Sequence, residues 1–98
     1  MAREDAITHL REAEPELRAH GAAALYLFGS VARDEARAGS DVDVFVDPAL
    51  DRRFGFDEFM AVYELLQERL GASVDYTTRD GLHRRLRPAI EASAVRVF

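Results

Sequence analysis

Two short apolar runs restrict what this chain can fold into more than any other feature. They are "ALYLF" at 24–28 and "VDVFV" at 42–46. Uninterrupted apolar runs of this length are typical of strands that are buried on both faces. The second run nevertheless contains Asp43, and Asp41 stands just before it. A strand that otherwise belongs to the core therefore carries two like charges, spaced two residues apart.

The rest of the pattern alternates helices with strands. An amphipathic helical region is expected from about residue 3 to 20, with a break near Glu14, because Pro15 cannot lie mid-helix without losing a hydrogen bond. The clearest helix covers 56–70, where apolar residues recur every three or four positions until Gly71 ends the run. The other expected elements are a short helix at 30–37, a strand at 72–78, a helix interrupted or bent near Pro88 and a last strand at 94–98. This order predicts a single α/β (α+β) domain over 1–98, with one mixed sheet of about three or four strands and helices packed on it.

Composition excludes several classes of protein. The chain has no cysteine, so disulfides and a thiolate zinc site are excluded and nothing suggests export. No apolar run approaches the roughly 20 residues that span a bilayer, and the charged start "MAREDAITHL" lacks the apolar middle of a signal peptide. The formal net charge of −5 argues against general binding to a phosphate backbone. We therefore expect a cytoplasmic protein with no membrane contact and no direct nucleic-acid binding.

Asp41 and Asp43 are expected to point to the same face of the second strand, roughly 6.5–7 Å apart, because side chains alternate along a strand. Phe45 continues that face, so the face is not simply solvated. Two partly buried carboxylates this close repel each other unless one is protonated or a cation bridges them. Hard divalent cations such as Mg²⁺ bind such oxygens together with substrate phosphates. The alternative is a half-exposed strand whose polar face is acidic by chance, and the pair alone does not decide between the two interpretations.

Gly29 and Ser30 follow the first strand directly, where a tight turn and a helix start are expected. The free amides of a helix start can bind an anion, although an ordinary strand-to-helix connection also suits glycine and serine. With Ser30 as the N-cap, Arg33 falls at the third helical position, where a cation opposes the helix dipole, and one turn from Arg37. Such a placement is easier to explain if Arg33 faces an anion such as a triphosphate.

Together these residues provide an anion site, an arginine and two carboxylates on neighbouring elements. This is the equipment of metal-assisted phosphoryl or nucleotidyl transfer. Two-metal sites of this type usually need a third carboxylate, and Asp75 is the candidate, as a lone acid in the middle of the next expected strand. By itself, Asp75 would be better explained as a strand-end aspartate that caps a turn.

The stretch "GSVARDEARAGSDVDVFV" resembles the nucleotide-binding motif of the DNA polymerase β-like nucleotidyltransferases, in which ten residues separate Gly-Ser from Asp-x-Asp. The likeness is greatest to the minimal nucleotidyltransferase (MNT) proteins, and it covers nearly the whole chain, from the leading helix to the terminal "RLRPAIEASAVRVF". It implies the small nucleotidyltransferase fold. It also implies a function, because family members are antitoxins that transfer AMP from ATP to a tyrosine of a HEPN-domain ribonuclease toxin and so inactivate it.

The resemblance implies roles for two groups of residues. The phosphates of the nucleotide would be bound by Gly29 and Ser30, with Arg33 and Ser40 assisting. Two Mg²⁺ ions would be held by three catalytic carboxylates, Asp41, Asp43 and Asp75. Asp75 would also take the proton from the attacking hydroxyl. The implied ligands are therefore two Mg²⁺ ions and ATP as substrate, and the implied partner is a HEPN-domain toxin in a hetero-oligomer.

The chain departs from the family's pattern at two places. Many relatives have glycine after the motif arginine, where this chain has Asp34, and an extra carboxylate near the phosphates could weaken nucleotide binding. Relatives also tend to have apolar residues after the third aspartate, where this chain has "YTT" at 76–78, which leaves the register of that strand open. Neither departure removes a catalytic group.

Two other functions stay open. The chain could be a non-catalytic antitoxin that neutralises its toxin by occlusion, although a pure binder has no reason to keep three costly carboxylates together. It could also transfer a nucleotide to a small molecule, although enzymes of that kind usually carry a further substrate-binding domain. The three histidines show no metal-ligand spacing and receive no role. An apolar helical stripe is expected to face the core rather than a partner, and it consists of Phe56, Phe59, Tyr63 and Leu66.

Overall fold

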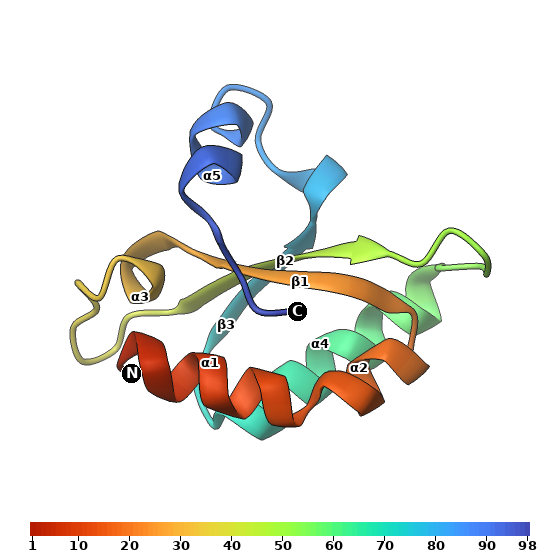
Figure 1. The fold of residues 1–98 in the computed structure, drawn as a ribbon, viewed down its shortest axis with the longest axis horizontal. Helices are drawn as coiled ribbons and strands as arrows, with labels where there is room; N and C mark the ends of the chain where they lie inside the picture. Colours follow the sequence, from red (N-terminus) through yellow and green to blue (C-terminus); the bar gives the residue numbers. More distant parts are fainter.

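A computed structural model describes residues 1–98 as one open sheet with helices on both sides (Figure 1). Three helices cover one face: α1 (Arg3–Glu12), α2 (Glu14–Ala19) and α4 (Phe56–Leu70). The strands are β1 (Ala22–Phe28), β2 (Val42–Pro48), β3 (Val74–Thr78) and β4 (Val95–Arg96). The short helix α3 (Gly29–Ala32) follows β1, whereas the 3₁₀ turn η1 (Arg79–Gly81) and α5 (Arg87–Ser93) follow β3. The predicted mixed α/β architecture with a single small sheet is confirmed.

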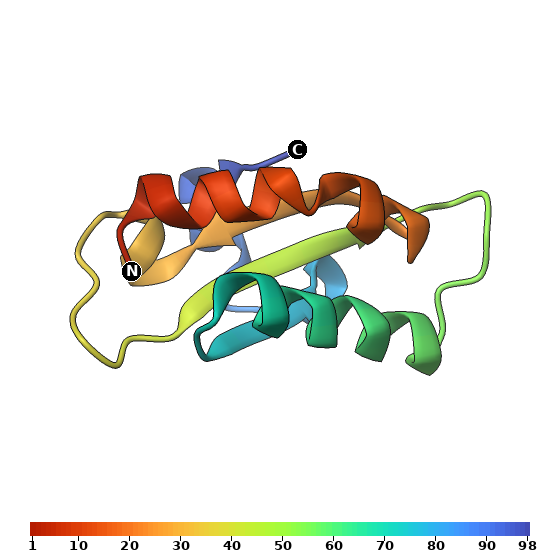
Figure 2. The ribbon, with the colours of Figure 1, turned by 90° about the horizontal axis from the view of Figure 1, so that it is seen from below.

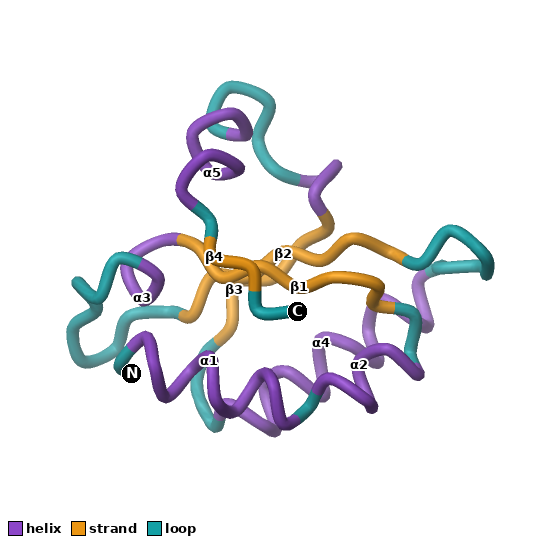
Figure 3. Tube along the Cα trace, in the orientation of Figure 1, coloured by secondary structure: helices purple, strands orange, loops and turns teal.

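The strand order is β3-β2-β1-β4, so β1 and β2 are central and β3 and β4 are edges. Figure 3 colours the strands orange, with α1, α2 and α4 on one side of them and α5 on the other. β1 runs antiparallel to β2 and to β4, whereas β2 and β3 are parallel. Parallel neighbours need a crossover connection, and α4 provides it. The starts of β2 and β3 therefore meet at one end of the sheet, beside the end of β1.

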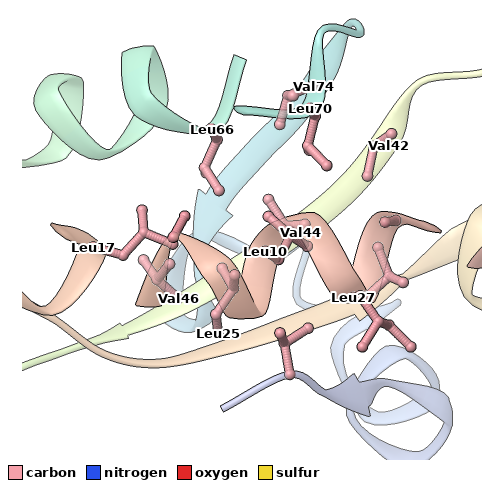
Figure 4. Close-up of a cluster of buried hydrophobic side chains, with 14 of the residues drawn as sticks. Leu10, Leu17, Leu25, Leu27, Val42, Val44, Val46, Leu66, Leu70 and Val74 are labelled. Atoms are coloured by element: carbon pink, nitrogen blue, oxygen red, sulfur yellow. The ribbon is translucent and has the colours of Figure 1, made fainter. Parts of the chain in front are cut away.

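The hydrophobic core lies between the sheet and the helices α1, α2 and α4 (Figures 2 and 4). Val42, Val44 and Val46 point into it from β2, as the alternation of that strand predicts. The fully buried leucines of this layer are Leu10, Leu17, Leu25, Leu27 and Leu66. Each such side chain contributes roughly 1.5–3 kcal/mol by leaving water, so this layer holds the sheet and helices together. The intervening residues of β2, Asp43 among them, must face the other side.

We call that other side of the sheet the outer face. Phe45 is fully buried there, because Tyr26 stacks on it with 4.8 Å between ring centroids and Phe28 packs against it at 5.8 Å. Arg79 of η1 covers the same ring, with its guanidinium carbon 5.0 Å from the centroid. The expectation that the face carrying Asp43 is not simply solvated is therefore confirmed.

Pro15 and Gly71 lie at helix boundaries as the sequence predicts, whereas two other expected helices differ from the structure. Pro15 lies in the first turn of α2, directly after the break that ends α1, and Gly71 closes α4 with φ +59. The helix expected at 30–37 was wrong beyond its first turn, because α3 ends at Ala32 and the chain turns at Asp34 with φ +58. Pro88 does not bend a helix but lies in the first turn of α5, where its missing N–H costs nothing. No helix combines the length with the apolar character that a membrane crossing requires.

Phe56 was wrongly placed in the core by its spacing. It is the first residue of α4 and is 76% exposed, whereas Leu66 of the same expected stripe is fully buried. The line that α4 buries runs through Val62, Leu66 and Leu70. At 3.6 residues per turn, Phe56 lies roughly a quarter turn away from that line, which explains its exposure.

Candidate active site

Gly29 brings the start of α3 into contact with the carboxylate of Asp43. β1 ends at Phe28, whose Cα is the register partner of Asp43 on the antiparallel strand β2. Gly29 then turns with φ +73, a left-handed conformation that glycine adopts without steric cost. A Cβ at this position would collide with Oδ2 of Asp43. Glycine is therefore required here twice, by the turn and by the approach of the carboxylate.

Ser30 is the second residue of α3 and does not cap it, in contrast to the expectation from the sequence. The N-cap is Phe28, and no side chain makes a capping hydrogen bond. Ser30 is partly exposed beside Gly29. Its hydroxyl is therefore available to a ligand rather than committed to the helix start.

Asp43 and Asp75 lie side by side on the outer face. Their Cα atoms are register partners on the parallel strands β2 and β3. Burial, followed by the negative charges of Asp75 and Asp41, raises the pKa of Asp43 from 3.8 to about 6, and the charge of Arg33 opposes this shift. The ionised form of Asp43 is thus disfavoured in the free protein, and a bound cation would relieve that penalty.

Asp41 stands just before β2 and is exposed, and its effect on Asp43 places a third negative charge at the same end of the sheet. No three His, Cys, Asp or Glu side chains converge as a ready-made metal cluster. The donor chemistry nevertheless fits a hard cation, since Mg²⁺ commonly uses one or two carboxylates and completes its shell with water and substrate phosphates. Metal binding by Asp41, Asp43 and Asp75 stays a prediction, which the chemistry of their carboxylates supports.

Arg33 does not occupy the position expected from the sequence. It is the C-cap of the one-turn helix α3, and its N–H donates to the carbonyl of Gly29 at 3.2 Å. The helix dipole favours a cation at this end, so the argument from an unfavourable position was wrong. The expected clash with Arg37 also disappears, because the helix does not continue. The guanidinium pairs with Glu35 at 3.1 Å and is 57% exposed, and its charge still acts on Asp43.

Asp34 adopts a left-handed conformation, which would suit the glycine that the family's pattern leads one to expect at this position. Its φ is +58, and its Oδ1 accepts a hydrogen bond from the N–H of Arg3 at 3.3 Å. Arg3 is the first residue of α1, and a negative charge is favoured at a helix N-terminus. The carboxylate of Asp34 is therefore engaged by α1.

Ser40 closes the next turn, where its hydroxyl accepts a hydrogen bond from the N–H of Arg37 at 3.0 Å, and its role toward a nucleotide stays a prediction.

Tyr76 explains how "YTT" can follow Asp75 without disturbing the register. Its ring lies on the core side of β3 and stacks on Phe59 at 4.5 Å and on Tyr63 at 5.8 Å. Its hydroxyl is buried without a hydrogen-bond partner, and burial raises its pKa. Tyr76 thus substitutes for an apolar residue, at the expense of one unpaired polar atom.

Arg79 is the residue of the outer face that sequence reasoning missed. Its Nε and Nη2 donate to the two carboxylate oxygens of Asp47 at 2.8 and 2.9 Å, and its Nη1 donates to Glu91 at 2.7 Å. These hydrogen bonds raise the pKa of Arg79 above its ordinary value. The sequence did contain a signal for such a residue, because Asp47 continues the alternation of Asp43 on a partly buried face and therefore needs a cation.

An open pocket of about 480 Å³ beside Arg79 is lined by none of the predicted site residues.

Comparisons with known proteins give consistent results. The family described as nucleotidyltransferase domain (NTP_transf_2) matches residues 10–97. A provisionally named protein adenylyltransferase of Methanocaldococcus jannaschii is 36% identical over 88 residues, which cover 90% of this chain and 92% of the relative. A second protein of that organism, with the same provisional name, is 37% identical over 57 residues, which cover 58% of this chain and 57% of the relative. The chain thus spans little more than half of this second relative.

Two solved structures show the same fold. A structure provisionally described as a minimal nucleotidyltransferase superposes with a TM-score of 0.77 at 36% identity and covers 97% of this chain and 95% of its own. A toxin–antitoxin crystal structure with AMP-PNP superposes with a TM-score of 0.66 and covers all of this chain and 73% of its own. The second likeness concerns the fold alone, since its identity is 19%.

Proposed function

The chain belongs to the nucleotidyltransferase domain family, and from this premise we propose that it is an antitoxin that transfers AMP from ATP to a tyrosine of a partner HEPN-domain ribonuclease toxin. Such a modification would inactivate the toxin. Family membership and the relative named as a protein adenylyltransferase support adenylyl transfer to a protein. A toxin–antitoxin structure of the same fold supports the choice of a toxin as partner.

The observation that carries the proposal is the convergence of Gly29, Asp43 and Asp75 at one end of the sheet. Gly29 packs against the carboxylate of Asp43, and Asp75 is the register partner of Asp43. The three residues come from three different elements, so the convergence is a product of the fold and not of one local motif. A turn with free amides beside paired carboxylates suits a nucleotide whose phosphates carry a divalent cation.

The proposed reaction is an in-line displacement. The oxygen of the acceptor tyrosine attacks the α-phosphorus of ATP, the bond from that phosphorus to the bridging oxygen of the β-phosphate breaks, and pyrophosphate leaves. Asp75 is exposed, so it can be reached by an acceptor from outside and can take the tyrosine proton. Gly29 and Ser30 would bind the β- and γ-phosphates, with Arg33 and Ser40 assisting. Mg²⁺ held by Asp41, Asp43 and Asp75 would offset the negative charge of the phosphates.

Asp75→Asn separates this proposal from neutralisation by occlusion. General-base catalysis contributes about 10²–10⁴-fold in rate, so the variant should bind the partner but fail to add AMP and fail to neutralise the ribonuclease. Intact mass of the partner after incubation with MgATP, read beside its ribonuclease activity, measures both effects. Asp51→Asn, in the exposed loop before α4, makes the same chemical change away from the site and should behave like the wild type. Full neutralisation by Asp75→Asn without any mass increase would show that occlusion is the mechanism.

A further inference from the structure

Residues 79–93 form an arch on the outer face, from η1 to the end of α5. Figure 1 shows the arch rising away from α1, α2 and α4. α5 has no buried residue, and Leu82 is the one buried residue of the whole arch. The hydrophobic core therefore does not hold this segment in place.

Ion pairs hold the base of the arch instead. Arg79 joins it to the sheet through Asp47 at 2.8 Å and to α5 through Glu91 at 2.7 Å. Arg87 then pairs with the same Glu91 at 3.2 Å and with Asp80 at 3.1 Å. Because several charges share partners, this network restrains both ends of the arch more than isolated surface pairs would. The tip is thus presented in a defined position.

The tip of the arch, residues 83–86, has the character of a contact surface. Arg84 and Arg85 are exposed and take part in none of the chain's ion pairs. Leu86 is 57% exposed beside them. The tip contains no acidic residue, although the net charge of the chain is −5. Arginine is enriched at protein interfaces, where acidic residues and lysine are depleted, and the exposed Leu86 adds apolar area that a partner could bury.

The position of the arch indicates which protein would contact the tip. Asp75 lies four residues before Arg79 on the strand that leads into the arch. A protein that presents a tyrosine to Asp75 must approach the outer face, and the arch stands on that face (Figure 1). We infer that the tip of the arch docks on the acceptor protein, against a surface that surrounds an apolar pocket with Asp and Glu side chains. The identity of the acceptor rests on the proposed function, whereas the chemistry of the surface follows from the tip.

Charge reversal of the tip tests the inference. Arg84→Glu combined with Arg85→Glu should weaken binding of the HEPN-domain partner roughly 10-fold or more, as loss of a main interface contact does. Leu86→Ser should weaken it as well, whereas Arg84→Lys with Arg85→Lys should retain most of the affinity. Affinity for MgATP should not change in any of these variants, because the tip contains no nucleotide-binding residue. The wild-type affinity should also fall with added salt.

A second adjacent arginine pair provides the matched control. Arg52 and Arg53 are exposed in the loop before α4, and Arg52 donates to the carbonyl of Ala19 on the helical side of the molecule. Arg52→Glu with Arg53→Glu should leave partner affinity unchanged. Equal losses for the two pairs, unchanged affinity after reversal of the tip, or no binding by the wild type would each overturn the inference. Binding of an RNA oligonucleotide that the tip reversal abolishes would overturn it too, in favour of a nucleic-acid contact.

The binding assay is independent of catalysis because it is run without ATP. If the wild type binds through the tip but adds no AMP, the proposed function fails and the docking surface stands. If AMP is added to the partner and the tip reversal changes neither binding nor the KM for the partner, the docking inference fails and the proposed function stands.

Discussion

Asp43→Asn should stabilise the unliganded protein while it abolishes nucleotidyl transfer. The pKa of Asp43 is about 6 in the folded chain against an ordinary 3.8. At about 1.36 kcal/mol per pKa unit, the full shift would correspond to about 3 kcal/mol of lost stability once the carboxyl is ionised. Asp43 is only partly buried, so solvent screening reduces this figure and we expect about 1 kcal/mol. In a domain of this size, that difference raises Tm by roughly 4–8 °C.

The gain should depend on pH in a defined direction. A raised pKa means that the folded chain holds the proton of Asp43 more tightly than the unfolded chain does. Ionisation therefore removes stability as the pH rises from 3.8 to about 6, and asparagine at this position escapes the loss. The difference in unfolding free energy between Asp43→Asn and the wild type should thus be larger by about 1 kcal/mol at neutral pH than near pH 4.

Urea denaturation of the two proteins across this pH range measures the difference directly. Titrating groups that do not interact with Asp43 cancel in the comparison because both proteins contain them. Asp51→Asn is the control, since it removes an exposed carboxylate that lies away from the site. A difference that does not change with pH, or a variant less stable than the wild type at neutral pH, would refute the reasoning that burial and neighbouring negative charges raise the pKa of Asp43.

Three further variants, the first with a matched control, test separate parts of the structure. Gly29→Ala should cost about 2 kcal/mol in urea denaturation and abolish ATP binding in calorimetry, because it adds a collision with Asp43 to the strain of φ +73. Gly39→Ala, with φ +84 and no atom within 4 Å of the added Cβ, should cost about half as much and leave ATP binding intact, and equal effects would contradict the close-approach argument. Arg79→Ala should lower the free energy of unfolding by about 2 kcal/mol because it leaves a partly buried carboxylate unpaired, so a change below about 0.5 kcal/mol would speak against the network. Tyr76→Phe should leave the free energy of unfolding unchanged or raise it by up to about 1 kcal/mol in thermal melts, since the Tyr76 hydroxyl has no partner. A clear loss of stability would reveal an unrecognised hydrogen bond.

The strands and the long helix could be predicted from sequence because their signals are local. The valines of β2 alternate with polar or outer-face residues, and Gly71 adopts the left-handed conformation that ends α4. The length of α3 could not be predicted in this way. The chain leaves the helix where Asp34 turns toward the start of α1, and its partner Arg3 is 31 positions away in the sequence.

The candidate site also combines features that local sequence signals predict with features that depend on contacts distant in the sequence. Asp41 and Asp43 are visible as a pair in the sequence because side chains two apart share a face in a strand, although β2 itself begins at Val42. The partnership of Asp43 with Asp75 depends on the register of two parallel strands that are joined by a crossover helix, so the sequence indicates it mainly through the family resemblance. The position of Asp47 indicates that a cation is needed on the outer face, but no local pattern identifies Arg79 as that cation, because its partners Asp47 and Glu91 lie on β2 and α5.

The most direct test of the central claim is which phosphate of ATP reaches the partner. The purified chain would be incubated with the HEPN-domain protein and Mg²⁺ in parallel reactions, one with ATP labelled at the α-phosphate and one with ATP labelled at the γ-phosphate. We expect label on the partner only from the α-labelled nucleotide, with pyrophosphate as the other product and no label with Asp43→Asn. Transfer from the γ-labelled nucleotide, or neutralisation of the toxin without any label, would contradict adenylyl transfer by this site.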